Sequence, residues 1–126
     1  MVDVELIVCG WLASQLPGTA VGTTLVGWRA GDPHVLVRRS GGRVRYGWLD
    51  EAEITCEVRA GTRQAAADLT GSVRDALGRI AAEHTTTDGV LSRSVELTGP
   101  AWVPDADGQG SYEVRWQVSA HPTRGD

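Results

Sequence analysis

The sequence VRRSGGRVRYGWLDEAEITCEVRAGTRQAAADL, residues 37–69, predicts two strands and the start of a helix in close succession. Ser40-Gly41-Gly42 tolerates the positive φ angles of a tight hairpin turn. We therefore expect a strand from His34 to turn back there and to return over residues 43–47. Residues 52–59 then alternate apolar and polar side chains. This alternation is typical of a strand that is buried on one side only, as in an antiparallel sheet covered by helices.

Two segments carry the spacing of amphipathic helices. After Gly61-Thr62, apolar residues recur at steps of three and four from Ala66 to Ile80, and Thr62 is a candidate N-cap. A shorter apolar stripe begins after Asp3, another candidate cap, and Pro17-Gly18 ends it. We expect both helices to lie on the same face of the sheet.

The rest of the chain adds strands and one long loop. Residues 90–97 and 111–120 are predicted strands, joined by the Pro-, Gly- and Asp-rich residues 98–110. Residues 19–32 are expected to form a short strand or an extended arm. The prediction for residues 1–126 is a single α+β domain, with an antiparallel β-sheet covered on one face by two helices.

Composition narrows the functional classes. The net charge is -4, and all 12 basic residues are arginines. A general nucleic-acid binder needs a surplus of cations, so the negative net charge argues against that class. Schiff-base enzymes and Walker loops need a lysine, and the chain has none, so both are excluded. The hydrophobic fraction of 41% is ordinary, and no apolar run reaches the roughly 18 residues of a membrane span. The first residues lack the basic lead of a secretory signal, so we expect a cytoplasmic protein without a membrane partner.

Two short patterns resemble metal or disulfide sites. Cys9 and Cys56 are too few and too far apart for a zinc site or a disulfide framework, and buried thiols are expected. DADGQG at residues 105–110 resembles the start of an EF-hand loop. The twelfth position, however, is Trp116 where calcium needs a glutamate. A polar surface loop is the better interpretation.

The remaining polar groups also predict no chemistry. The three histidines begin or end predicted elements, where a solvated side chain is expected; they are His34, His84 and His121. Asp50, Glu51 and Glu53 could hold a cation, but a solvated acidic start of a strand is the preferred interpretation. The terminal RGD is interpreted as chance. We therefore expect no catalytic residue, no metal site and no cofactor.

The chain has five tryptophans and no phenylalanine. Trp11 and Trp116 fall at core positions of their predicted elements. Trp28, Trp48 and Trp102 lie in Gly- and Pro-rich connections. Tryptophan is enriched at protein–protein contacts, so at least one of these three is predicted to lie at an interface. The alternative is that they fold back as lids on the core.

Two longer stretches carry a family resemblance. PHVLVRRSGGRVRYGWLDEAEITCEVRAGTRQAAADLTGSVRDAL is followed by GPAWVPDADGQGSYEVRWQVSAH near the end of the chain. With the N-terminal helix, this order resembles the tail terminator (tail-completion) proteins of long-tailed bacteriophages over nearly the whole chain. The resemblance rests on the strand ending in RRSGG, Asp50 before an alternating strand, the RAGTRQAAADL junction and the final loop-to-strand hairpin. Residues 19–32 fit the family least well.

The resemblance implies a sheet covered on one side by helices and a structural role that is not enzymatic. It implies a ring, usually hexameric, that caps the tail tube, stops its polymerisation and presents the head-joining surface. The expected partners are further copies of the chain, the major tail tube protein and the head–tail connector or neck protein. DNA would pass through without specific binding. The expected location is the neck-proximal end of the virion tail, after assembly in the host cytoplasm.

This hypothesis assigns surfaces to named residues. The hairpin around residues 40–42 and the loop 102–110 are expected to project along the ring axis. Expected interface residues are Arg38, Arg39, Trp48, Trp102 and Asp105. Expected lumen-facing residues are Glu53, Glu57 and Glu113. Two alternatives stay open: a head-closure or neck protein, and a small ligand-binding or enzyme domain that uses the one-sided sheet as its floor.

Overall fold

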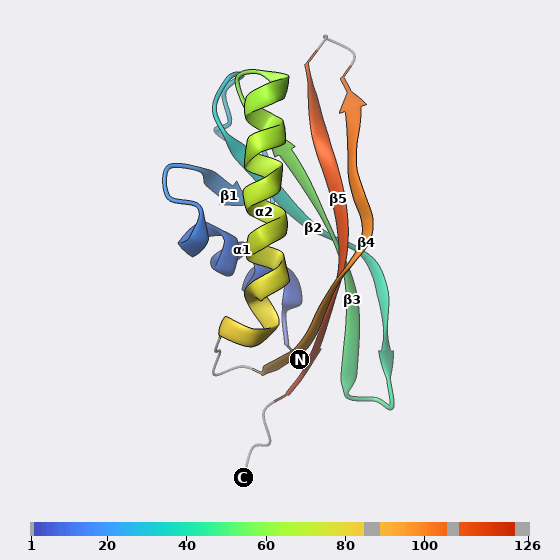
Figure 1. The fold of residues 1–126 in the computed structure, drawn as a ribbon. Helices are drawn as coiled ribbons and strands as arrows, with labels where there is room; N and C mark the ends of the chain where they lie inside the picture. Colours follow the sequence, from blue (N-terminus) through green and yellow to red (C-terminus); the bar gives the residue numbers. More distant parts are fainter. Residues whose placement is uncertain (1, 85–88, 106–108, 123–126) are drawn as a thin grey trace.

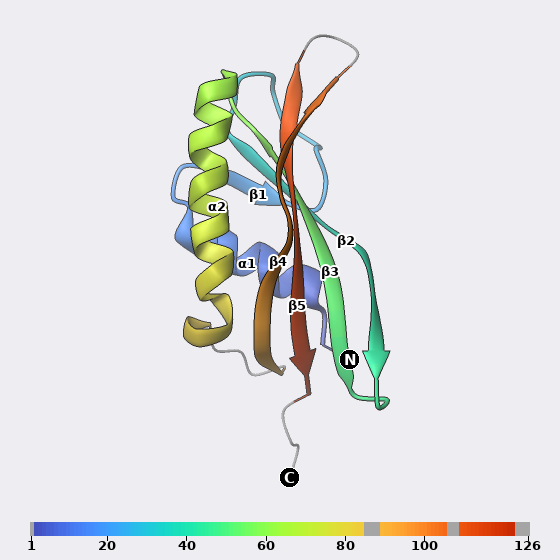
Figure 2. The ribbon, with the colours of Figure 1, turned by 45° about the vertical axis from the view of Figure 1, so that its right-hand side comes forward.

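The computed structural model describes residues 2–84, 89–105 and 109–122, and both helices lie on one face of a five-stranded sheet (Figures 1 and 2). The helices are α1 (Val4–Gln15) and α2 (Arg63–Glu83). The strands are β1 (Ala20–Gly22), β2 (His34–Arg45), β3 (Leu49–Arg59), β4 (Val90–Pro104) and β5 (Gly110–His121). The predicted single α+β domain with two helices on one face is confirmed.

The strand order is β1-β2-β3-β5-β4. Neighbouring strands are antiparallel from β2 to β4, as expected. The exception is β1, which pairs parallel with the first residues of β2 and makes the sheet mixed. A parallel neighbour needs a crossover connection, and residues 23–33 provide it. This is the segment for which a short strand or an arm was expected.

Both predicted helix caps are present. The backbone N–H of Leu6 donates to the Asp3 carboxylate at 3.1 Å, and the N–H of Ala65 donates to the Thr62 hydroxyl at 3.0 Å. The two helices are joined by the indole N–H of Trp11, which donates to the carbonyl of Ala76 at 2.7 Å.

The core lies between the helices and the sheet face beneath them. Successive side chains of a strand point to opposite faces of the sheet, so every second side chain of β3 and β5 points toward the helices. The apolar residues at these positions are therefore buried. The core includes Val4, Val8, Trp11 and Leu12 of α1; Val73, Ala76, Leu77 and Ile80 of α2; and Val35, Val37, Ala52, Ile54, Cys56, Val58, Leu91, Val114, Trp116, Val118 and Ala120 of the sheet.

The predicted turn at Ser40-Gly41-Gly42 is wrong. β2 runs through these residues and bends at a register shift between Arg39 and Gly41. The glycines serve a bulge: Gly42 has φ 104°, and a Cβ there would overlap the carbonyl oxygen of Glu51. Residues 43–45, predicted to return, are therefore the end of β2 itself.

The chain turns at Tyr46-Gly47 instead. Both residues have positive φ angles, 57° and 76°, and the N–H of Trp48 donates to the carbonyl of Arg45 at 3.1 Å. Two consecutive positive φ angles match the right-handed twist of the flanking strands. The β2–β3 hairpin consequently projects past the helices at the end of the sheet opposite the β4–β5 hairpin (Figure 1).

The loop predicted for residues 98–110 is also largely wrong. β4 continues to Pro104, and its ladder with β5 absorbs Gly99 and Pro100 through register shifts. Proline is tolerated at such irregular edge positions because no ladder hydrogen bond is lost. Trp102 therefore lies on a strand, paired with Tyr112.

Candidate functional site

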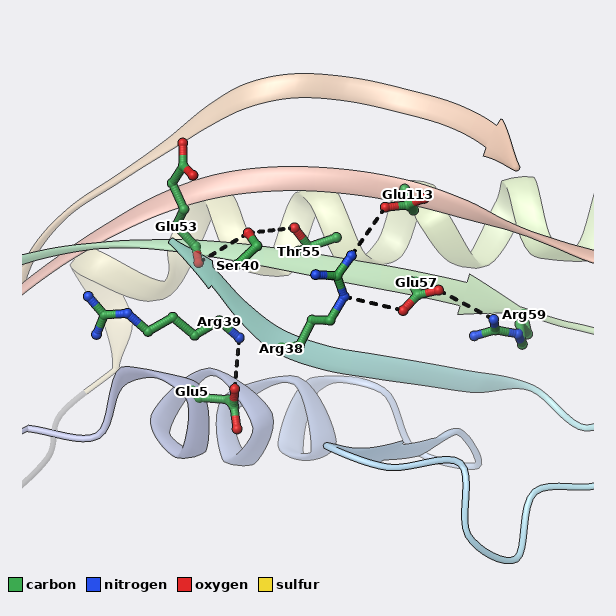
Figure 3. Close-up of polar contacts among 9 residues, drawn as sticks. All are labelled: Glu5, Arg38, Arg39, Ser40, Glu53, Thr55, Glu57, Arg59 and Glu113. Carbon is green, nitrogen blue, oxygen red and sulfur yellow. Dashed lines mark hydrogen bonds and ion pairs between the residues drawn. The ribbon is translucent and has the colours of Figure 1, made fainter. Parts of the chain in front are cut away.

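The sheet face away from the helices carries a ladder of charged side chains (Figure 3). Glu57 and Glu113 are direct cross-strand neighbours, which alone would be repulsive. Arg38 lies beside both, with Nε 3.5 Å from Glu57 Oε2 and Nη2 3.7 Å from Glu113 Oε1. Arg38 holds the two carboxylates side by side. Because these ion pairs are partly exposed, they contribute little to stability.

One end of this face is covered by the connection 23–33. Arg59 is buried, with its guanidinium 5.8 Å from the ring centre of Trp28. His34 is also buried, and its pKa is lowered by burial and then by the charge of Arg59, against a hydrogen bond with the backbone of Thr24. The expectation that His34 is solvated is wrong, because the connection that makes β1 parallel folds over it. Trp28 thus behaves as a lid.

Next along the face, β2 and β3 are joined by hydroxyl groups. The buried Thr55 donates to Ser40 Oγ at 2.7 Å, and the Ser40 hydroxyl donates to the carbonyl of Glu53 at 3.4 Å. The carboxylate of Glu53 lies beside Gly41, where a Cβ would be 2.9 Å from Oε2. The bulge therefore places Ser40 over the strand pair at the point where the face opens to solvent.

The acids expected to face a lumen, Glu53, Glu57 and Glu113, share this uncovered face and are half-buried. Their position at a lumen stays a prediction. The face also carries Arg38 and the exposed Arg115, whose strand partner is Thr55. It is therefore mixed in charge and not simply acidic.

Arg38 and Arg39, both expected at an interface, point to opposite faces because they are adjacent in a strand. Arg39 lies on the helix side, where its backbone N–H donates to Glu5 at 2.7 Å. Its guanidinium donates to both carboxylate oxygens of Asp50, at 2.7 and 2.6 Å. The hydrogen bond with Asp50 is the largest cause of its raised pKa. The backbone N–H and the guanidinium of Arg39 therefore both bind acidic side chains of the same chain.

The predicted acidic cluster is divided between the two faces. Asp50 is 7% exposed on the helix side, so the expectation of a solvated side chain is wrong for it. Glu51 lies on the opposite face and pairs with Arg45 and, at 3.6 Å, with Arg43. Alternation along β3 separates Asp50 from Glu51, and each of these two carboxylates is paired with arginine.

The end of the β2–β3 hairpin is apolar and exposed. Val44 is 49% exposed, Tyr46 77% and Trp48 53%; these three residues are called the hairpin tip below. The Trp48 ring makes an edge contact with His121 at 5.8 Å and lies 6.1 Å from Tyr46. Among the connection tryptophans, Trp48 is therefore the one left available for a partner.

A groove lies on the opposite side of the molecule, between the end of α1 and the middle of α2. Its volume is about 610 Å³. Leu16, Pro17 and Leu69 form its apolar part, and the carboxylates of Asp68 and Asp75 lie at its border. The full lining of this α1–α2 groove is Gln15, Leu16, Pro17, Thr19, Asp68, Leu69, Gly71, Ser72, Asp75, Ala76 and Arg79.

At the other end of the sheet, Trp102 is half-buried in a stack. Its ring lies 5.0 Å from that of Tyr112 in an edge arrangement, and the Arg63 guanidinium lies 4.9 Å from it. The Arg63 Nε also donates to the Tyr112 hydroxyl at 3.2 Å. Asp105 is exposed at the end of β4, and its N–H donates to the carbonyl of Gln109 at 2.7 Å. Trp102 thus closes the core end, and Asp105 projects beyond it.

The described ranges hold no group of three or more His, Cys, Asp and Glu side chains placed to bind a metal. Asp107, the second acid of the rejected calcium pattern, and the RGD tail lie outside the described residues. Cys9 and Cys56 are free thiols, and burial raises the pKa of Cys56 to about 12. Cys56 is fully buried as expected, whereas Cys9 is half-buried. Neither helix of the described part is long and apolar enough to span a membrane.

Comparison with known proteins adds no relative. No protein-family model matches the chain, and no curated protein sequence matches it. The chain's own surfaces are therefore the basis for a functional argument. Sequence reasoning named Trp48 but missed Tyr46 beside it and the α1–α2 groove. The sequence RYGW, residues 45–48, places two aromatic residues around a glycine, and this pattern could have indicated an exposed aromatic turn.

Proposed function

We propose that this chain is the ring-forming tail terminator subunit of a long-tailed bacteriophage, the family that its sequence resembles. The observation that carries the proposal is the β2–β3 hairpin, which projects past the helices (Figure 2). Three large side chains at its end, those of the hairpin tip, are exposed. Clustered exposed apolar side chains are typical of a surface that a protein partner covers. In a ring, the partner is the next copy.

The sheet edges support self-association. Beyond Leu36, β2 pairs with β3 on one side, and no described strand lies on its other side. β4 is the opposite edge of the sheet. Its register shifts and prolines disfavour regular pairing, as in edges that are protected from aggregation. The hairpin side of the molecule is consequently the better candidate for contact between copies.

The remaining surfaces suit the other tasks of a terminator. The β4–β5 end, with Trp102 held in place and Asp105 exposed, is the candidate for axial contact with the tail tube or the neck. The charged sheet face with Glu53, Glu57 and Glu113 is the candidate lumen wall, where paired charges would limit adhesion of DNA. Residues 40–42, expected to project along the ring axis, lie inside β2 and have no axial role in this proposal.

The test is electron microscopy of lysates from a phage that lacks this gene. We expect DNA-filled heads beside unattached tails, many of them longer than normal because tube growth is not stopped. Supplying the wild-type chain from a plasmid should restore complete virions. Leaking, empty heads beside tails of normal length would instead identify a head-closure or neck protein and overturn the terminator assignment.

A further inference from the structure

We propose that the hairpin tip of one copy docks in the α1–α2 groove of the next copy. The inference rests on the proposed ring and names the contact that closes it. The occupant of the groove is a second copy of this chain, and the contact joins two different surfaces.

The tip is shaped in advance for insertion. Tyr46 has a φ of 57°, a conformation that a bulky residue adopts only when its surroundings hold it there. The Trp48 N–H closes the turn on Arg45, and the Trp48 ring rests against His121. Rigid exposed aromatic side chains lose little conformational entropy on binding and are the usual anchors of protein contacts.

The groove has room for such an anchor. Its volume of about 610 Å³ lies within the range of ligand-sized sites. Leu16 and Ala76 line it but are buried, so the exposed Pro17 and the half-buried Leu69 offer the apolar contact. Gly71 lies on the exposed side of α2, with no atom within 4 Å of where its Cβ would be. The missing side chain keeps the groove open.

The charges of the two surfaces are complementary. Arg43 and Arg45 lie beside the tip, with 66% and 43% of their side chains exposed. Both form an ion pair with the same carboxylate, that of Glu51. Asp68 and Asp75 border the groove. The one cation that lines the groove, Arg79, is already engaged by Asp75, Glu83 and Gln15. With these partners counted, Arg43 and Arg45 against Glu51 leave one positive charge beside the tip, and Asp68 and Asp75 against Arg79 leave one negative charge at the groove. This difference favours docking of the tip in the groove over contact between two tips.

The two surfaces cannot meet within one chain, because the hairpin turn and the helix pair lie on different sides of the molecule (Figure 1). A contact between unlike surfaces is heterologous, and repeating it produces a closed ring when the rotation closes. Every copy would then use one tip and one groove.

The test uses the full chain and three variants, followed by sedimentation velocity and native mass spectrometry. Trp48→Ala removes the anchor, and Gly71→Gln fills the groove with a residue that suits a helix. Gly10→Gln is the matched control, since Gly10 is exposed on α1 with no atom near its Cβ position and does not line the groove. Circular dichroism and thermal unfolding establish that each variant is folded.

We expect the wild type and Gly10→Gln to assemble equally. Trp48→Ala and Gly71→Gln should each weaken assembly by about thirtyfold or more, as for a hot-spot side chain. Mixing the two defective variants is decisive. The intact groove of Trp48→Ala accepts the intact tip of Gly71→Gln, so the mixture should form pairs and nothing larger.

Assembly of Trp48→Ala and Gly71→Gln at wild-type strength would overturn the docking contact and leave the ring proposal standing. Two monomeric variants that form no pairs on mixing would also overturn it. A wild type that stays monomeric at every accessible concentration rules out docking between free copies. The lysate phenotype of the gene deletion tests the terminator role separately.

Discussion

Arg39 and Asp50 form a two-point ion pair on the helix side of the sheet, with Nη1 2.7 Å from Oδ2 and Nη2 2.6 Å from Oδ1. Asp50 is only 7% exposed at the start of β3, and Arg39 supplies the partner that a buried carboxylate needs. The pair joins the middle of β2 to the start of β3, where the hairpin begins to leave the cover of the helices.

Replacing Asp50 by asparagine keeps the shape and removes the charge. We expect Asp50→Asn to lower the free energy of unfolding by about 1–3 kcal/mol, because Arg39 keeps one carbonyl acceptor but meets an NH2 donor in place of the second oxygen and loses its counter-charge. Urea denaturation measures the change. The matched control is Glu51→Gln, which affects exposed arginines on the other face and should cost less. An Asp50→Asn variant as stable as the wild type would contradict this role for the pair.

Gly41 and Gly42 provide a second matched pair. At Gly42, φ is 104° and a Cβ would overlap backbone atoms of β3, so Gly42→Ala should destabilise the protein by about 2 kcal/mol or more. At Gly41, the nearest atom to a Cβ is the movable carboxylate of Glu53. Gly41→Ala should therefore change stability by no more than about 1 kcal/mol. Thermal unfolding compares the two, and equal costs would show that the bulge geometry is misassigned.

The Cys56 thiol predicts a stability loss at high pH. Burial raises its pKa to about 12, with the charge of Cys9 adding to the shift. Above the thiol's ordinary pKa of about 8.5–9, the unfolded chain loses a proton that the folded chain keeps, so stability falls as pH rises toward about 12. Cys56→Ala should flatten this fall by up to about 1.4 kcal/mol per pH unit.

Other groups that titrate in this range are common to both proteins, so the comparison of urea curves isolates the thiol. Cys9→Ala, which removes a half-buried thiol, should keep most of the slope. An unchanged slope in Cys56→Ala would refute the assignment.

The charged ladder predicts how the uncovered face treats DNA. The wild-type chain should show no salt-sensitive binding to duplex DNA at micromolar concentration, because Arg38 is matched by Glu57 and Glu113. The double variant Glu57→Gln, Glu113→Gln frees Arg38 beside the exposed Arg115, and binding should appear at low salt. Fluorescence anisotropy of a labelled duplex is the measurement. The double variant Asp68→Asn, Glu83→Gln, on α2, is the control because it changes the net charge by the same two units. DNA binding by the wild type would argue against a lumen role for this face.

Local patterns determined much of this fold. The caps at Asp3 and Thr62 were predictable because a capping side chain acts on backbone only three residues away. The inward faces of β3 and β5 were predictable because burial on one face imposes a period of two. Both helices and the α+β class follow from such short-range signals.

The sequence misplaced the hairpin turn because Gly-Gly suits both a turn and a bulge. Register decided between them: pairing of residues 34–39 with residues 54–59 leaves Ser40 as an extra residue, and the turn moves to Tyr46-Gly47. The same long-range pairing kept Trp102 in β4. Local propensity does not reveal which residues a strand will face across the sheet.

The sequence by itself determined the α+β class, the two helices, the core faces and the absence of lysine chemistry. Only the tertiary structure decided that Asp50 is buried against Arg39, that His34 lies beneath the connection 23–33, and that the hairpin tip and the α1–α2 groove lie on different sides of the molecule. The physical reason is that periodicity and capping act within a few residues. Burial of a charge, the covering of a face and the distance between two surfaces depend on contacts between segments far apart in the chain.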